Sequence, residues 1–281
     1  MNNSKQNSTL IKPSSKLKTF GFNELYEYKD LFYYMVLRDV KSIYKQTVLG
    51  FSWAIIRPVF SMIIFSLVFG KLANIPSDGI PYPVFTYAAL IPWTYFSTAL
   101  TLSTQSLIST KSIFTKVYFP RLIIPMVPVL SKLVDFLISF IILFFLMVFY
   151  KIQPNYNIIF LPCLILIMIA TSFGVGCWLS ALAIQFRDIP HGIQFLSQLL
   201  MYAAPVVWPL SLVSDKFGEN ASYLYSIYPM VGVIEGFRAS LLGSVKMPFL
   251  EILIGAIASV ILFLSGILYY RSKEKIFADV A

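Results

Sequence analysis

The chain has 281 residues, of which 58% are apolar and only 12% are charged, and its formal net charge is +9. A soluble globular domain carries about 25% charged residues, so this chain has too few charges to cover a water-facing surface. The composition argues against a disordered chain, a nucleic-acid-binding protein and a soluble enzyme, and it predicts an integral membrane protein.

The first fifty residues are more polar than the rest of the chain. Residues 1–22 contain no apolar stretch of the kind that a signal peptide carries, and we expect them to form a mobile cytoplasmic tail. Residues 23–50 are predicted to form an amphipathic helix in the membrane interface, with Tyr28, Phe32 and Met35 on the apolar face. The alternative is a helix that packs on its own chain.

Six apolar segments are predicted to cross the membrane, because a bilayer core of about 30 Å requires roughly 20 apolar residues. Residues 211–248 are broken by glycine and proline, which favours a re-entrant helical hairpin. The predicted fold is an all-α, polytopic transmembrane domain over residues 51–272, followed by a cytoplasmic C-terminus at 273–281. The predicted spans are 54–72, 84–108, 123–150, 158–184, 191–210 and 249–270.

The distribution of basic residues predicts the orientation of these spans. Six spans place both termini on one side of the membrane, and 17 of the 22 Lys and Arg residues fall on that side. Because cytoplasmic loops carry the excess of Lys and Arg, both termini are expected in the cytoplasm.

The sequence offers little for catalysis. It has one histidine, His191, and no GxxxxGK[ST] loop, so we predict neither an enzyme nor a cofactor or metal site on this chain. The charged residues within apolar segments form pairs at helical spacing, Lys132 with Asp135 and Glu235 with Arg238. Acidic and histidine side chains in mid-membrane are scarce, which disfavours a proton-coupled transporter and predicts an external energy source.

Six segments carry a resemblance to a known family. They are RDVKSIYKQTVLGFSWAIIRP (Arg38–Pro58), IPWTYFSTAL (Ile91–Leu100), TKVYFPRLIIP (Thr115–Pro125), FRDI (Phe186–Ile189), YPMVGVIEGFR (Tyr228–Arg238) and FADV (Phe277–Val280). In this order they resemble the permease subunits of ABC-type polysaccharide exporters of the transmembrane type-2 class. The resemblance extends over nearly the whole chain and is closest to permeases for O-antigen and capsular polysaccharide.

The resemblance implies a homodimer in the bacterial inner membrane, with two copies of a cytoplasmic ABC ATPase subunit that bind ATP and Mg. The cargo would be an undecaprenyl-linked polysaccharide, which moves in contact with membrane lipid. The pair Glu235 and Arg238 would lie in the re-entrant region at the outer mouth. Residues 111–121 would form the coupling loop that meets the ATPase, through Lys111, Phe114, Lys116, Tyr118, Phe119 and Arg121.

Aromatic rings are expected to guide the sugar chain, because sugar C–H faces stack on them with modest strength and transport requires weak binding. Trp and Tyr also gather at membrane interfaces, so an interfacial position for Trp53 and Trp208 stays open. The predicted channel aromatics are Trp53, Phe60, Trp93, Tyr95, Phe96, Tyr202 and Trp208.

Other functions stay open on the sequence alone. A type-2 permease for teichoic acid, a small drug or a lipid would share the same coupling chemistry. A membrane-embedded glycan-processing enzyme would need paired carboxylates facing a cavity, and no such pair stands out. A structural scaffold would not need broken helices.

Overall fold

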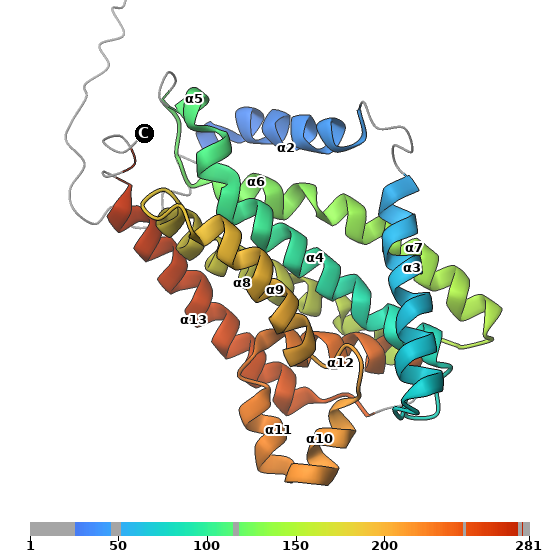
Figure 1. Cartoon of the computed structure of the whole chain (residues 1–281). Coiled ribbons are helices and arrows are strands. Elements are labelled where there is room, and N and C mark those ends of the chain that lie inside the picture. The colour runs from blue at the N-terminus through green and yellow to red at the C-terminus, as the bar shows by residue number, and fades with distance from the viewer. Residues whose placement is uncertain (1–25, 46–51, 115–117, 244–245, 275–276, 278–281) are drawn as a thin grey trace, which may run out of the picture.

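A computed structural model describes residues 26–45, 52–114, 118–243, 246–274 and 277. Every regular element in these ranges is a helix, as the all-α prediction requires (Figure 1). The predicted tail at 1–22, residues 23–25 and 46–50 of the predicted amphipathic segment and most of the C-terminal segment 273–281 lie outside the described residues.

Four helical stretches within the described ranges are long and apolar enough to cross a membrane. They correspond to the predicted spans 54–72, 123–150, 158–184 and 249–270, and they identify a multi-pass membrane protein. The stretches are α3 with η2 (Trp53–Phe65, Ser66–Leu72), α6 with α7 (Ile123–Ser131, Leu133–Phe149), η3 with α8 (Tyr156–Phe160, Leu161–Ala183), and α13 (Phe249–Lys273).

Helix α4 (Tyr82–Ser109) occupies the predicted segment 84–108 and lies at the centre of the bundle. It contacts α3, α6, α7 and α8, and also α9 (Ile189–Ala203) and α12 (Pro229–Leu242). These neighbours shield α4 from lipid, so its Thr and Ser side chains are tolerated where they find acceptors. Thr98, for example, donates to the carbonyl of Thr94 at 2.6 Å. Such side chains make α4 less apolar than the four stretches above.

Helices α8 and α13 cross in close contact. A Cβ atom on Gly266 would collide with the carbonyl of Gly174, so glycine is needed at this contact. Near the crossing, Thr171 donates a hydrogen bond of 3.0 Å to Ser259. The close approach makes these two helices a rigid unit beside α4.

The predicted span 191–210 ends earlier than expected. Helix α9 has 15 residues, which is about 22 Å and less than the bilayer core of about 30 Å. The helix stops because Ala204, with ψ of 152°, precedes Pro205, and a proline disfavours helical backbone in the residue before it. Residues 204–209 form turns instead of a final helical segment.

The segment predicted as a re-entrant hairpin contains three short helices. Gly218, with φ of 85°, separates α10 (Leu210–Phe217) from α11 (Glu219–Tyr225), and the two helices pack on each other. All 14 residues of α12 are buried. Figure 1 places α10 and α11 at one end of the bundle, and α2 (Lys29–Tyr44), α5 (Lys111–Phe114) and the C-terminal end of α13 at the opposite end.

Helix α2 lies across the bundle and packs on α6 (Figure 1). Its predicted apolar face is confirmed, because Met35 is buried and Tyr28 and Phe32 pack against the core. Tyr33 and Tyr34 are exposed on the other side. The helix therefore packs on its own chain through this face, and its position in the membrane interface stays a prediction.

Candidate functional site

Of the predicted coupling residues, those that the structure describes lie on α5 or within a few residues after it. Lys111 is exposed on α5, and Tyr118 is 85% exposed. Phe119, in contrast, is only 4% exposed and belongs to the core of this chain. Of these two neighbouring rings, only that of Tyr118 is accessible for contact with another protein. Phe114 contributes backbone to α5, and Lys116 lies outside the described residues.

Arg121 connects this loop to the C-terminal end of α13. Its Nη1 donates to the carbonyl of Glu274 at 2.6 Å, and the hydroxyl of Tyr270 donates to the Arg121 carbonyl at 2.9 Å. Tyr270 and Phe277 are fully buried, with ring centroids 5.1 Å apart. A carbonyl near a helix C-terminus has no partner within the helix, so a guanidinium is well matched to it. We call Arg121, Tyr270, Glu274 and Phe277 the C-terminal brace.

The two predicted ion pairs are both formed. Lys132 Nζ lies 2.8 Å from Asp135 Oδ2, beside the junction of α6 and α7. Arg238 Nη1 lies 2.7 Å from Glu235 Oε1 on α12, and these side chains are 1% and 4% exposed. A buried pair carries a large desolvation cost, which is offset only when further hydrogen bonds satisfy both ions.

The Glu235–Arg238 pair finds these further partners in the segment between α9 and α10. Arg238 Nη2 donates to the carbonyl of Val206 at 2.9 Å, and Nη1 donates to that of Trp208 at 3.3 Å. The backbone N–H of Leu210 donates to Glu235 Oε1 at 3.1 Å.

Helix α4 contributes to the same arrangement. Arg238 Nε donates to the carbonyl of Phe85 at 3.3 Å, and the guanidinium lies 3.6 Å from the Phe85 ring centroid. Tyr82 donates its hydroxyl to the carbonyl of Val207 at 2.7 Å. Side chains of α12 and α4 thus replace the backbone partners that a continued helix would have supplied to residues 204–210. We call Tyr82, Glu235 and Arg238, with the backbone groups that they bond, the 204–210 clamp.

The predicted channel aromatics divide into buried and accessible rings. Trp93, Tyr95 and Phe96 are all less than 5% exposed on α4, and the Tyr95 hydroxyl donates to the carbonyl of Val129 at 2.8 Å. The structure does not place these three rings on a surface that a sugar could reach, because all three are buried among the helices that pack on α4. Trp53, Phe60 and Tyr202 are 42%, 62% and 52% exposed.

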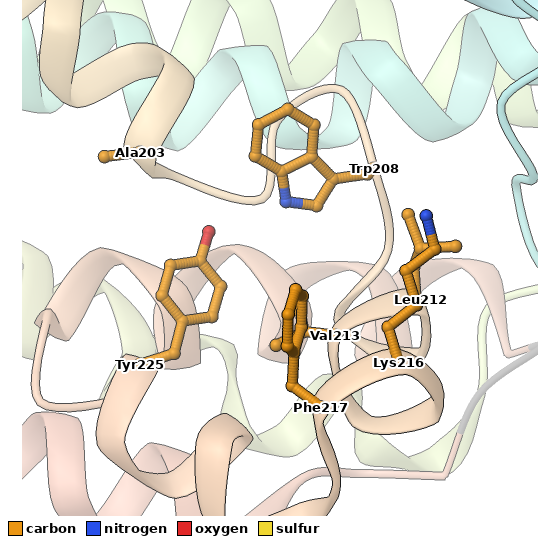
Figure 2. Close-up of a pocket in the computed structure, with 7 residues that line it drawn as sticks. All are labelled: Ala203, Trp208, Leu212, Val213, Lys216, Phe217 and Tyr225. Atoms are coloured by element: carbon orange, nitrogen blue, oxygen red, sulfur yellow. The ribbon is translucent and has the colours of Figure 1, made fainter.

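Trp208 lines a pocket of about 460 Å³ between the 204–209 turn and the α10–α11 pair (Figure 2). Figure 2 shows its indole nitrogen and the Tyr225 hydroxyl turned toward the space between these elements. That hydroxyl is buried and interacts with the Trp208 side chain, but the two do not form a hydrogen bond of good geometry in the described part of the chain. The pocket is lined by Ala203, Trp208, Leu212, Val213, Lys216, Phe217 and Tyr225.

Several of these site residues were missed by the sequence reasoning. Tyr82, Phe217, Tyr225 and Tyr270 carry no local pattern that separates them from the other Tyr and Phe residues, because their roles depend on partners distant in sequence. The motif containing Phe277 was recognised, but its contact with Tyr270 was not. Among the described residues, no three His, Cys, Asp or Glu side chains gather as metal ligands would.

Comparison with known proteins gives a consistent result over most of the chain. Residues 30–242 match the family described as ABC-2 type transporter. The O-antigen export system permease protein RfbA of Myxococcus xanthus is 29% identical over 259 residues, covering 91% of this chain and 97% of that protein. RfbA of Klebsiella pneumoniae is 25% identical over 253 residues, covering 89% and 95%. The polysialic acid transport protein KpsM of Escherichia coli is 22% identical over 247 residues, covering 86% and 92%.

Proposed function

This chain belongs to the ABC-2 type transporter family, and we propose that it is the permease subunit of an ATP-driven exporter of lipid-linked polysaccharide of the O-antigen type. The observation that carries the proposal is similarity over nearly the full length of proteins named for O-antigen export. The similarity to a polysialic acid transport protein is lower but of similar extent, and it supports a polysaccharide as the class of cargo. Teichoic acid, a small drug and a lipid are the competing cargoes.

The energy for transport comes from two copies of a separate ATPase, which bind ATP and Mg. The loop 111–121 is the proposed docking element, and the exposed ring of Tyr118 is its best-supported anchor. Aromatic side chains are frequent hot spots of protein interfaces. Phe119 supports the loop from inside, since it is buried.

The permease acts as a homodimer in the bacterial inner membrane. Large apolar side chains are exposed on several helices, among them Phe60 on α3, Phe144 on α7 and Phe195 on α9, and a dimer would bury one of these faces. A second copy of the chain would cover such faces more specifically than lipid does. Trp53, Phe60, Tyr202 and Trp208 are the predicted aromatics that remain candidates for contact with the glycan.

The proposed topology has six spans. Four are the apolar helical stretches described above, and α4 and α9 are the other two. The 204–210 clamp supports a crossing at α9, because non-helical backbone is tolerated at membrane depth only where protein satisfies its polar groups. Both termini are proposed in the cytoplasm, and the α10–α11 pair forms an outer re-entrant hairpin.

Single-cysteine labelling tests this topology. With Cys163 and Cys177 replaced, Glu219→Cys at the start of α11 should react with a membrane-impermeant maleimide from outside in intact spheroplasts. Tyr118→Cys, an exposed position four residues after α5, should react only after permeabilisation, because α5 lies at the opposite end of the bundle (Figure 1). Cytoplasmic labelling of Glu219→Cys would overturn the outer hairpin and the six-span count together.

Deletion of the gene tests the function itself. We expect surface polysaccharide to be lost and lipid-linked glycan to accumulate on the cytoplasmic side, and expression of the intact chain should restore export. Unchanged surface polysaccharide in the deletion strain would remove the proposed function.

A further inference from the structure

We propose that the pocket between Trp208 and Tyr225 is a binding subsite for one pyranose ring of the exported glycan at the outer end of the permease. The inference rests on the proposed function and extends it to a defined place in the fold. It assigns roles to Phe217, Tyr225 and Lys216, none of which the sequence motifs single out.

One wall of the pocket is held in place by the 204–210 clamp. The carbonyl of Trp208 accepts from Arg238, and the carbonyl of the preceding Val207 accepts from Tyr82. The indole therefore projects from backbone fixed on both sides, although the chain here is not helical. A ring presented by fixed backbone loses less freedom on binding than one on an unsupported loop.

The opposite wall is formed by the α10–α11 pair. Ser211, in the first turn of α10, donates to Asp78 Oδ1 at 2.9 Å, which connects this helix to the segment before α4. Phe217 ends α10 and Tyr225 ends α11, and both rings face the space below Trp208 in Figure 2. Three aromatic side chains from three elements thus surround one pocket.

The chemistry of the lining favours a sugar over an acyl chain. Aromatic faces attract the C–H faces of a pyranose, while the indole N–H, the phenol hydroxyl and the Lys216 ammonium can bond to its hydroxyl groups. In the described part of the chain the Tyr225 hydroxyl has only a poorly aligned contact with the Trp208 side chain, so a ligand hydroxyl would satisfy this buried group better. An acyl chain would add no hydrogen bond to it.

The volume of the pocket and the small number of hydrogen-bonding groups in its lining also suit a subsite on a transport path. A volume of about 460 Å³ lies within the range of small-molecule sites, roughly 300–1,000 Å³. Phe217 is 74% exposed, so a ligand can reach this ring from outside the protein. Stacking with few hydrogen bonds gives the weak binding that a moving chain requires.

The test is equilibrium binding of lipid-free, radiolabelled polysaccharide, prepared from the same bacterium, to the purified permease–ATPase complex in nanodiscs. Phe217→Ala should weaken binding by about five- to tenfold, the scale expected for loss of one stacking ring. Leu224→Ala is the matched control, since Leu224 is 70% exposed on α11 but does not line the pocket. Equal affinities for these two variants would overturn the proposal.

A second measurement distinguishes a sugar from a lipid. In a variant that keeps only Trp208, with Trp53, Trp93 and Trp178 changed to Phe, the polysaccharide should alter Trp208 fluorescence. Quenching by phosphatidylcholine with a nitroxide on its acyl chain, unaffected by the polysaccharide, would assign the pocket to lipid and overturn the proposal. If the deletion strain loses surface glycan while Phe217→Ala binds normally, only the pocket assignment fails. If that strain keeps its surface glycan, the proposed function fails.

Discussion

Arg238 donates the hydrogen bonds that backbone carbonyls after the end of α9 would otherwise lack. Its guanidinium bonds to three backbone carbonyls and to the Glu235 carboxylate, while Glu235 also accepts from Leu210. Because each group of the pair is satisfied several times, the desolvation cost of burying it is offset locally. The pair therefore fixes the end of α9 and the beginning of α10 relative to α4.

Removing Arg238 should be strongly destabilising. Arg238→Ala leaves Glu235 buried without its counter-ion and deprives three carbonyls of a donor, a loss of about 3–5 kcal/mol. The change is measured as the apparent unfolding midpoint of the purified permease in one fixed detergent. Arg38→Ala, at the exposed pair with Asp39, is the control and should shift the midpoint little.

The double variant Glu235→Ala/Arg238→Ala sharpens this prediction. It removes both charges, so it should be less destabilised than the sum of the two single variants. Additive losses would mean that the ions do not compensate each other, and an unchanged midpoint for Arg238→Ala would contradict the role given to the clamp.

Tyr202 is the remaining test of stacking within α9, where its ring is 52% exposed. Tyr202→Ala should impair export of long glycans more than basal ATP hydrolysis, and Tyr202→Phe should export almost normally because the ring is kept. Surface glycan length and ATPase rate, measured in parallel, check the expectation. Leu196→Ala, 45% exposed on the same helix, is the control. Normal export by Tyr202→Ala would exclude stacking at this position.

At the scale of elements, the loop 111–121 combines the proposed ATPase contact, at Tyr118, with a buried residue, Phe119. Tyr118→Ala removes an exposed ring, so it should weaken association with the ATPase and lower transport while the permease remains stable. Phe119→Ala empties a core position and should cost about 3–5 kcal/mol of stability before any effect on coupling. Co-purification of the ATPase and the unfolding midpoint separate the two effects. Normal co-purification and transport by Tyr118→Ala would contradict the docking assignment.

The elements differ in how far the sequence could predict them. Hydropathy identified four stretches that the structure confirms as apolar helices, and helical spacing identified the Lys132–Asp135 and Glu235–Arg238 pairs. The burial of Trp93, Tyr95 and Phe96 was not predictable in the same way. Apolar residues occur on all sides of α4, so their periodicity does not indicate which face meets solvent.

The end of α9 and the clamp mark a second limit. Pro205 and Pro209 indicated a break, but the sequence could not tell whether the helix would kink and continue or stop at Ala203. That outcome depends on Tyr82 and Arg238, which lie more than a hundred residues before the break and about thirty after it. Such partners are specified by the packed bundle and not by local propensity.

At the scale of the whole molecule, the C-terminal brace connects the proposed ATPase contact to the closely packed helices α8 and α13. Arg121 is the last residue of the loop 111–121, and its side chain and its carbonyl both bond to the C-terminal end of α13. Helix α13 in turn crosses α8 at Gly174 and Gly266, where glycine allows close packing. A displacement of the loop should therefore move the end of α13 rather than be absorbed by the loop alone.

Tyr270→Phe isolates this connection, because it removes only the hydroxyl that donates to the Arg121 carbonyl. Loss of one buried hydrogen bond costs about 1 kcal/mol, enough to loosen the brace without unfolding the chain. We expect the ATPase to bind normally but less glycan to be exported per ATP hydrolysed in reconstituted vesicles. Tyr269→Phe is the matched control, because its ring stacks on Trp178 at 4.2 Å and Phe can keep that contact. If both variants export equally per ATP, the brace holds the fold together but does not transmit the motion of the loop.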